Sequence, residues 1–359
     1  MDNTIMNSTP TESEDDDTWA NDKWMVPYLF LLLIIGTIGN SFGILLFQNS
    51  AMRKYSCSLY FLLMAIFDEL TLFCWVVNRL FGELSYTSFS NRSTILCKLF
   101  VVVYYSSSQA AVGMLVLAMF DRLYTTFKIA HGYFDVRVLT RRQHFQYICL
   151  GVFFSILIAM NSLLFGSQLF LSPEDDIEYC LIIDPDITQI YSIIDLCIYA
   201  IVPCICMLIG DILILYYIQK ARARVITINS SSKRREKQLS IMLVITSMIS
   251  LFIVSPYSFL KLLINFSIIL DTNIRTLYTL NDAFGLLSTC THAMHFYLFL
   301  IISSTIRKHF KSLLQSLVTN CSNARNIIQP VVIAPIKTTM SSQPTVHIIQ
   351  RTPCQQSIR

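Results

Sequence analysis

The sequence predicts an all-α membrane protein, a seven-transmembrane helix bundle followed by a short amphipathic eighth helix. Of its 359 residues 54% are hydrophobic and only 14% are charged, and the mean hydropathy is +0.55. Water-soluble domains carry far more charge. Seven stretches of about 20 or more residues are almost free of charge, which is the length that a helix needs to cross a bilayer. Because lipid offers no hydrogen-bond partners to the backbone, each stretch is expected to be helical.

The expected spans fill one membrane domain, residues 25–303. They cover residues 25–47, 59–80, 99–120, 145–170, 188–217, 239–265 and 277–302. An N-terminal tail of residues 1–24 precedes the domain, and it is rich in Ser, Thr, Asn and Asp. A second tail of residues 319–359 carries few signals of order. Both tails are expected to be disordered.

The basic residues predict that the N-terminus lies outside the cell. The N-terminal tail holds seven acids against one base and shows no signal peptide, so the first span is expected to insert by itself. Arg53 and Lys54 follow that span, and further lysines and arginines follow the third, fifth and seventh spans. Since basic loops stay in the cytoplasm, we expect a multi-pass protein of the plasma membrane with an extracellular N-terminus.

The segment between the fourth and fifth spans is acidic. Residues 167–189 hold six acids and no base. Acidic residues contribute little to membrane orientation, so topology alone does not explain this charge. Two interpretations stay open: the segment steers a cationic ligand toward the bundle, or it is a solvated loop.

Eleven cysteines are present, but topology leaves only Cys97 and Cys180 at the oxidising outer face. The other nine fall inside the expected spans or on the cytoplasmic side, where disulfides are not expected. Cys97 and Cys180 are therefore predicted to pair, which ties the start of the third helix to the acidic segment. The remaining cysteines are interpreted as small apolar packing residues.

Two surface modifications follow from the predicted topology. Asn7 and Asn91 begin Asn-x-Ser/Thr sequons on the outer side and are candidates for N-glycosylation. Residues 304–318, behind the seventh span, alternate apolar and basic groups at helical spacing and are expected to lie along the inner leaflet. Cys321 follows that segment and is a candidate for palmitoylation.

An acid lies in the middle of the second expected span. Asp68 is 28 residues after Asn40 of the Gly-Asn pair in the first span, and Glu69 stands beside it. A carboxylate inside the membrane costs several kcal/mol unless it is paired or faces water, so Asp68 is interpreted as functional. Glu69 points about 100° away on a helix and must find a separate partner or be protonated.

The third expected span ends in Asp121-Arg122-Leu123. Arg122 is 25 residues after Cys97, about 37 Å of helix at about 1.5 Å per residue, enough to cross about 30 Å of hydrocarbon. With the Gly-Asn pair and the buried acid, this pattern resembles the rhodopsin-like (class A) G-protein-coupled receptors over residues 26–310. Leu123 replaces the aromatic residue of that family's Asp-Arg-Tyr.

The resemblance implies a switch at Arg122. Glu236, 20 residues before Pro256, stands where the family places the acid that holds this arginine at rest. A guanidinium can exchange one carboxylate for another, so Asp121, Arg122 and Glu236 are interpreted as a latch. Pro203 and Pro256 match the family's kinks in the fifth and sixth helices. The alternative is that Arg122 only extends to the membrane surface.

Several positions depart from the family pattern. Val254 and Ser250 replace the aromatic residues of the sixth helix, and the run His-Phe-Tyr-Leu-Phe at residues 295–299 replaces Asn-Pro-x-x-Tyr. His295 and Phe299 are aligned with the family's Asn and Tyr; an alignment on Tyr297 would shift the register by two. The run is similar to that of invertebrate neuropeptide receptors of the FMRFamide type.

The ligand-binding candidates are polar residues in the outer turns of the helices. Tyr104 stands 18 residues before Arg122, where aminergic receptors carry an Asp, and the seventh span lacks the lysine that retinal needs. Neither an amine nor retinal is therefore expected. The candidates are Tyr104, Ser108, Asp195, Lys261, Asp282 and Arg79. With the acidic segment they favour a peptide with basic residues, although each alone also fits a solvent-facing position.

We therefore expect a receptor that binds an extracellular neuropeptide and activates a heterotrimeric G protein, with arrestin and a receptor kinase as further partners. The lipid bilayer is a further expected partner. No cofactor, metal or nucleic acid is expected. The histidines do not suggest an enzyme, and His292 and His295 are interpreted as packed or bonded within the seventh helix. The alternative is a seven-helix transporter or ligand-gated channel, which the lack of an inverted repeat disfavours.

Overall fold

The computed structural model describes most of the chain between residues 24 and 327. The described ranges are 24–55, 57–85, 87–131, 141–165, 167–171, 178–182, 190, 193–194, 196–224, 230–265 and 274–327. The long helices are α2 (Met25–Gln48), α3 (Ser58–Ser85), α4 (Thr94–His131), α5 (Arg141–Phe165), α7 (Val202–Arg224), α8 (Ser230–Asn265), α9 (Ile274–Ile302) and α10 (Ser304–Ile327).

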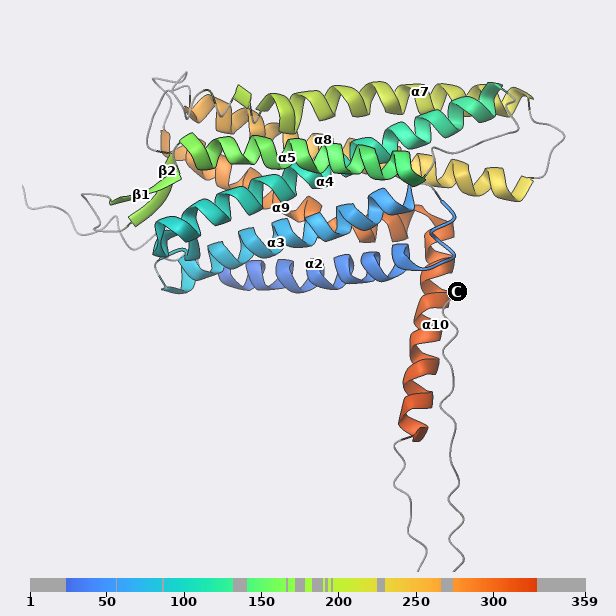
Figure 1. Ribbon diagram of the computed structural model, residues 1–359, viewed down its shortest axis with the longest axis horizontal. Helices are drawn as coiled ribbons and strands as arrows, with labels where there is room; N and C mark the ends of the chain where they lie inside the picture. The colour runs from blue at the N-terminus through green and yellow to red at the C-terminus, as the bar shows by residue number, and fades with distance from the viewer. Residues whose placement is uncertain are drawn as a thin grey trace, which may run out of the picture. The chain divides into compact units, whose positions relative to one another are not determined.

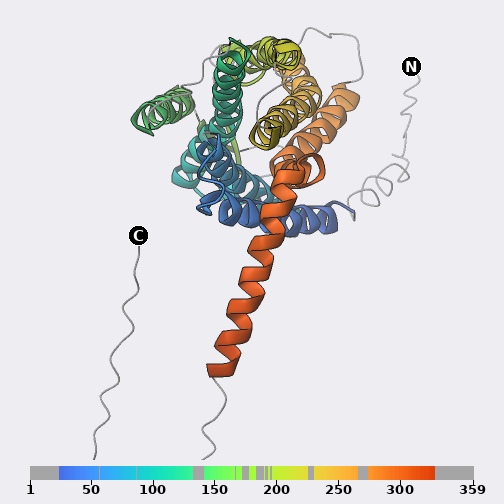
Figure 2. The same ribbon diagram turned by 90° about the vertical axis from the view of Figure 1, so that its right-hand side faces the viewer.

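The helices α2 to α5 and α7 to α9 lie side by side as one bundle (Figure 1). A view along the bundle shows them grouped around a common centre (Figure 2). α4 packs against α3, α5, α7 and α8 and is thus the central helix. The predicted all-α seven-helix bundle is confirmed.

The outside of the bundle suits a lipid environment. Among the described residues, six helices are long and apolar enough to span a membrane, and α5 contributes a shorter apolar stretch, Phe145–Leu157. Large apolar side chains such as Phe252 and Ile212 are mostly exposed on the helix surfaces. In water this surface would be unfavourable, whereas hydrocarbon accommodates it.

The fourth expected span was too long at its C-terminal end. α5 ends at Phe165, and Ser167–Leu171 forms strand β1, which pairs antiparallel with β2 (Glu178–Ile182). Cys180 lies opposite Leu169 in this hairpin. An apolar run that leaves the membrane can satisfy its backbone groups by strand pairing, and hydrophobicity alone does not separate this from one more helical turn.

The core contains two apolar clusters. The larger joins α2, α3, α4, α5, α7, α8 and α9 and is rich in Phe and Met. The smaller joins α2, α3 and α9 near the start of α2. The first turns of α10 complete the larger cluster, because the Phe310 ring lies 5.3 Å from that of Phe42 and 5.5 Å from that of Phe296. α10 runs past residue 318, where the surface helix was expected to end.

Close packing of α2 yields a first testable prediction. A Cβ atom at Gly36 would overlap the Leu72 side chain and lie 3.0 Å from Ala293 Cβ. Gly36→Ala is therefore expected to destabilise the protein by about 1–3 kcal/mol and to lower its thermal unfolding temperature in detergent. Gly113→Ala is the matched control, because a Cβ there meets nothing within 4 Å. Equal unfolding temperatures for the two variants would contradict this packing.

Candidate functional site

The centre of the bundle holds an acid between two histidines. α3 places Asp68 in the interior with 0% of its surface exposed, and α9 presents His292 and His295 from neighbouring turns. Nδ1 of His292 lies 2.6 Å from one Asp68 carboxylate oxygen, and Nδ1 of His295 lies 2.8 Å from the other. An ionised carboxylate only accepts hydrogen bonds, so both imidazoles donate. Both histidines are packed in the interior as expected, but their ring hydrogen bonds go to α3 and not to groups of their own helix.

Glu69 has a separate set of partners on α2. Thr37 donates to one of its carboxylate oxygens at 2.8 Å, and the Asn40 amide donates to the other at 3.1 Å. The same amide lies 3.3 Å from the backbone oxygen of His292. Asn40 therefore joins α2 to α3 and α9, and its contact on α3 is Glu69. Two adjacent acids are thus held by different helices, which fixes the rotation of α3.

A small cavity of about 30 Å³ lies beside the histidines, between α4, α7, α8 and α9. Val254 and Ser250 line it, and Ser250 Oγ lies 3.3 Å from Nε2 of His295. A cavity of this volume has room for one or two water molecules. It lies where aromatic residues were expected from the family pattern, because valine and serine fill less space.

The two expected kink prolines lie in different settings, one beside an irregular turn and one inside a continuous helix. Pro203, which lines the small cavity, is the second residue of α7 and follows a π-helical turn, η2 (Leu196–Ile201). Pro256 lies inside α8. A proline removes one backbone hydrogen bond, so each position is a natural point for a change of helix direction.

Asp121 and Arg122 pair at one end of the bundle, here called the arginine end. Arg122 Nη2 lies 3.4 Å from an Asp121 carboxylate oxygen, and both side chains are almost fully buried. Thr126 donates to the Arg122 backbone oxygen at 2.7 Å. Glu236 falls within α8, but its side chain lies outside the described residues.

Phe299 is buried in the larger core cluster, whereas Tyr297 is only partly buried and packs at the margin of that cluster. The Phe299 ring lies 5.0 Å from that of Phe61 and stacks 6.5 Å from that of His295. Tyr297 donates from its hydroxyl to the backbone oxygen of Ile35 at 2.8 Å, at an exposed position. This packing favours the alignment of Phe299 with the family's tyrosine position.

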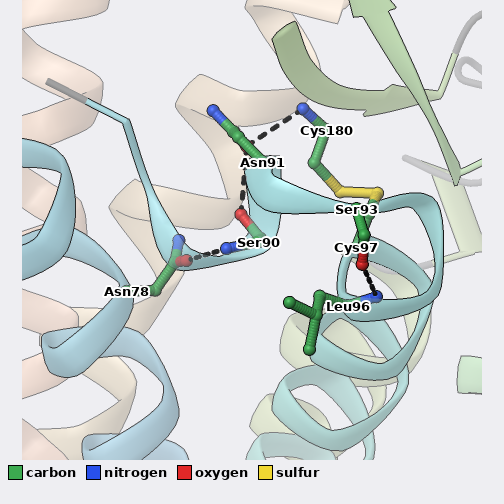
Figure 3. Close-up of a disulfide and its surroundings, with 7 residues drawn as sticks. All are labelled: Asn78, Ser90, Asn91, Ser93, Leu96, Cys97 and Cys180. Atoms are coloured by element: carbon green, nitrogen blue, oxygen red, sulfur yellow. Dashed lines mark hydrogen bonds between the residues drawn. A yellow bond between two sulfur atoms is a disulfide. The ribbon is translucent and has the colours of Figure 1, made fainter.

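Cys97 and Cys180 form the predicted disulfide at the opposite end of the bundle, here called the disulfide end (Figure 3). Ser93 caps α4 there, since its hydroxyl accepts the Leu96 backbone N–H at 3.2 Å. The Asn91 side-chain oxygen accepts the Cys180 backbone N–H at 3.2 Å. The short helix η1 (Phe89–Arg92), which contains Asn91, is thus tied to β2 beside the disulfide.

A cavity of about 450 Å³ opens at the disulfide end, and three of the predicted ligand-binding residues, Arg79, Tyr104 and Asp282, line it. Arg79 lies between two carboxylates, 3.1 Å from Glu83 and 3.9 Å from Asp282. The Tyr104 ring is stacked on that of Phe100, with centroids 5.8 Å apart. The cavity therefore combines an aromatic wall with a charged cluster.

The other predicted ligand-binding residues lie differently. Lys261 donates to the Tyr105 hydroxyl at 3.3 Å and sits 4.9 Å from the centre of that ring, and Tyr105 itself lines the cavity. Ser108 is buried on α4, one turn farther along than Tyr104. Asp195 lies outside the described residues.

Sequence reasoning missed several residues of this cavity. Phe100, Trp75, Asn78, Tyr257 and Asn281 all line it. A signal was present for Phe100, because it lies four residues before Tyr104 and so shares its helix face. Trp75 lies four residues before the candidate Arg79, and Asn78 and Asn281 are direct neighbours of the candidates Arg79 and Asp282. Only Tyr257 of α8 has no such neighbour among the predicted residues.

A comparison with models of protein families agrees with this geometry. A search of curated proteins found no match. The family described as 7 transmembrane receptor (rhodopsin family) matches residues 39–306, about three-quarters of the chain. The match contains the buried acid, the Asp-Arg pair, both disulfide cysteines and the prolines of α7 and α8. The chain therefore belongs to the rhodopsin family of seven-transmembrane receptors.

Proposed function

We propose that this receptor binds an extracellular neuropeptide with basic residues at the disulfide end and activates a heterotrimeric G protein at the arginine end. The observation that carries the ligand class is the position of Arg79 between Glu83 and Asp282. One guanidinium faces two carboxylates, so the cluster has a surplus negative charge. The Asp282 side chain is 61% exposed and lies at the longer distance, which leaves it accessible to a cationic group of a ligand.

The rest of the cavity suits the end of a peptide. Its volume of about 450 Å³ falls in the usual range for small-ligand sites. The stacked rings of Phe100 and Tyr104 offer a flat surface for an aromatic side chain or a guanidinium. The acidic segment predicted between the fourth and fifth spans would raise the local concentration of a basic peptide. The likeness of residues 295–299 to FMRFamide-type receptors supports an amidated neuropeptide.

The proposed orientation places the disulfide end outside and the arginine end in the cytoplasm. At the arginine end Arg122 is held by Asp121, and Glu236 of α8 is its proposed second resting partner. Ligand binding would favour the state in which Arg122 leaves these acids and the half of α8 before Pro256 swings outward. Arrestin and a receptor kinase would act at the same end, Cys321 would carry a palmitoyl group, and Asn7 and Asn91 would carry glycans.

A peptide panel tests this function. Cells that express the chain with a promiscuous G protein are exposed to amidated peptides that contain arginine and to matched peptides in which citrulline replaces arginine. We expect the arginine peptides to signal, and Asp282→Asn to lower their potency about tenfold to a hundredfold, as the loss of a charge-assisted hydrogen bond implies. Asp282→Glu keeps the charge and is the control.

An N-terminal epitope tag, stained on intact cells, shows that each variant reaches the surface in the proposed orientation. Equal potency of arginine and citrulline peptides would contradict the charge-based ligand class. Arginine peptides that bind without any G-protein response would contradict the signalling half of the proposal.

A further inference from the structure

The last turn of α4 meets α7 in a contact between two basic side chains. His131 Nε2 lies 3.4 Å from Lys220 Nζ, and His131 Nδ1 lies 3.0 Å from the backbone oxygen of Phe127. The Phe127 and Tyr217 rings are 5.2 Å apart, so the ends of the two helices lie side by side at the arginine end (Figure 1). This contact lies outside the polar core and the Asp-Arg pair described above.

The two partners of His131 determine where the protons of its ring lie. A backbone oxygen only accepts hydrogen bonds, so Nδ1 carries a proton and donates to Phe127. A lysine ammonium only donates, so Nε2 carries no proton and accepts from Lys220. The imidazole is therefore neutral in this arrangement. A second proton on the ring would place an N–H group against the ammonium and break the contact.

This contact has an excess of positive charge. In the part of the chain that the structure describes, the ion pairs include no carboxylate bonded to Lys220 or His131. Lys128, one turn earlier on α4, adds a further ammonium 4.5 Å from the centre of the Tyr124 ring. The phenol of Tyr217 also faces the imidazole, with ring centres 5.7 Å apart. The ends of α4 and α7 thus form a positive surface that attracts anions.

Accessible aromatic rings surround these basic groups. Lys220 Nζ lies 5.9 Å from the centre of the Tyr216 ring, and the side chains of Tyr216 and Tyr124 are 54% and 42% exposed. Both tyrosines lie near the ends of the expected spans 99–120 and 188–217. Tyrosine gathers where hydrocarbon meets the lipid headgroups. The positive surface is therefore open at the depth at which lipid phosphates lie.

We propose that the ends of α4 and α7 bind a phosphate group between His131 and Lys220, and that His131 takes up one proton when the phosphate enters. Nε2, now protonated, and the lysine ammonium then each donate to a phosphate oxygen, while Nδ1 keeps its bond to Phe127. Hydrogen bonds between charged partners are about twice as strong as neutral ones. The proton comes from solvent and returns to it when the phosphate leaves.

Proton uptake determines the sign of the pH dependence. Imidazole exchanges a proton between about pH 5 and 8. Toward the upper limit His131 is neutral and only Lys220 donates to the phosphate, whereas toward the lower limit both side chains donate. Binding is therefore stronger at acidic pH. The inference uses the proposed function only for the cytoplasmic position of the site, where a lipid headgroup of the inner leaflet or a soluble phosphate ester supplies the phosphate.

The experiment measures phosphate binding to the full-length receptor in maltoside micelles, whose headgroups carry no phosphate. The probes are a short-chain phosphatidylinositol phosphate and the free inositol phosphate without acyl chains. We expect the parent to bind the lipid probe about tenfold more tightly than His131→Gln at about pH 6, and equally at about pH 8. Comparison at one pH removes the titration of the probe itself. His131→Arg, which stays charged, should bind tightly at both pH values.

Two further variants and one further probe complete the test. Lys220→Gln should weaken binding about tenfold at both pH values, because the ammonium donates in either case. His309→Gln, at another histidine on the same side of the bundle, is the control and should keep the parental pH dependence. A glutamate-rich peptide that binds as tightly as the lipid probe would overturn the phosphate assignment and indicate an acidic protein partner.

Equal affinities of the parent and His131→Gln at about pH 6, or binding of neither probe, would overturn the inference. Binding of both probes supports the site and identifies soluble phosphate esters as sufficient, and binding of the lipid probe alone supports it and identifies a lipid headgroup as the source. Each variant should unfold at the parental temperature without a probe, because one accessible hydrogen bond contributes little. Neither peptide nor G protein enters the measurement, so its failure leaves the proposed function standing, and a receptor that does not signal can still pass it.

Discussion

Replacing His292 and His295 together by leucine is expected to destabilise the folded receptor by about 3–5 kcal/mol, the usual effect of removing the partners of a buried charge. Asp68 is fully buried, and each of its oxygens is bonded by one of these imidazoles. Without them the carboxylate has lost both interhelical hydrogen bonds in an apolar interior. Thermal unfolding of detergent-solubilised protein measures the effect.

A triple variant makes this prediction specific. Adding Asp68→Leu to the double histidine variant removes the stranded acid, and it is expected to restore much of the lost stability, because an apolar set of similar size carries no desolvation cost. His131→Leu, at the end of α4 and half-buried, is the control and should change the unfolding temperature little. A triple variant no more stable than the double variant would show that the histidines stabilise by packing and not by holding Asp68.

The same cluster connects the helices that the proposed signalling motion involves. His295 lies 3.3 Å from Ser250 of α8 through its second ring nitrogen, and His292 presents its backbone oxygen to Asn40 of α2. A single acid on α3 is thereby linked to α9 directly and to α2 and α8 through α9. Loosening the cluster is therefore expected to weaken the restraint on α8 as well as the fold.

The sequence predicted the helices well because lipid imposes a strict rule on the backbone. Each uncharged stretch had to satisfy its own hydrogen bonds, and α2, α3, α8 and α9 follow the expected spans closely. Outside the membrane, water can satisfy the backbone groups, so an uncharged stretch need not be helical there. The uncharged residues 167–170, Ser-Gln-Leu-Phe, were included in the fourth expected span, although the chain forms strand β1 there. No local signal marks that change, since strand pairing depends on Cys180 and its neighbours.

The candidate site was predictable where one residue carries the signal by itself. Asp68 was found because an acid in a membrane span is rare and costly, and Cys97 and Cys180 because only they fell at the outer face. Pairs were not predictable in the same way. His292 meets Asp68 across 224 positions of sequence, and this depends on how α9 is rotated against α3. The contact between His131 and Lys220 has the same origin, because two long helices must first be placed in register.

Removing the disulfide is the second change with a large expected effect. Cys97 and Cys180 are separated by 83 positions, and the bond holds β2 against the start of α4. Its loss is expected to cost about 2–5 kcal/mol of stability. It should also abolish peptide binding, because Cys180 lines the larger cavity and Asn91, which bonds the Cys180 backbone, lines it too. Thermal unfolding and binding of an arginine-containing amidated peptide measure the two effects.

The variants Cys97→Ser, Cys180→Ser and the double replacement break one and the same bond, so their effects should be equal and not additive. A reductant should bring the parent down to the unfolding temperature of the double variant and leave that variant unchanged. Cys149→Ser, at an exposed free cysteine of α5, is the control for general effects of cysteine replacement. If the reductant left the parent unaffected, the disulfide would not contribute to stability, and the position of β2 beside the bundle would have to rest on its hydrogen bond to Asn91 of η1. Because that bond is worth only about 1 kcal/mol, a destabilisation of several kcal/mol in the double variant would point to the disulfide.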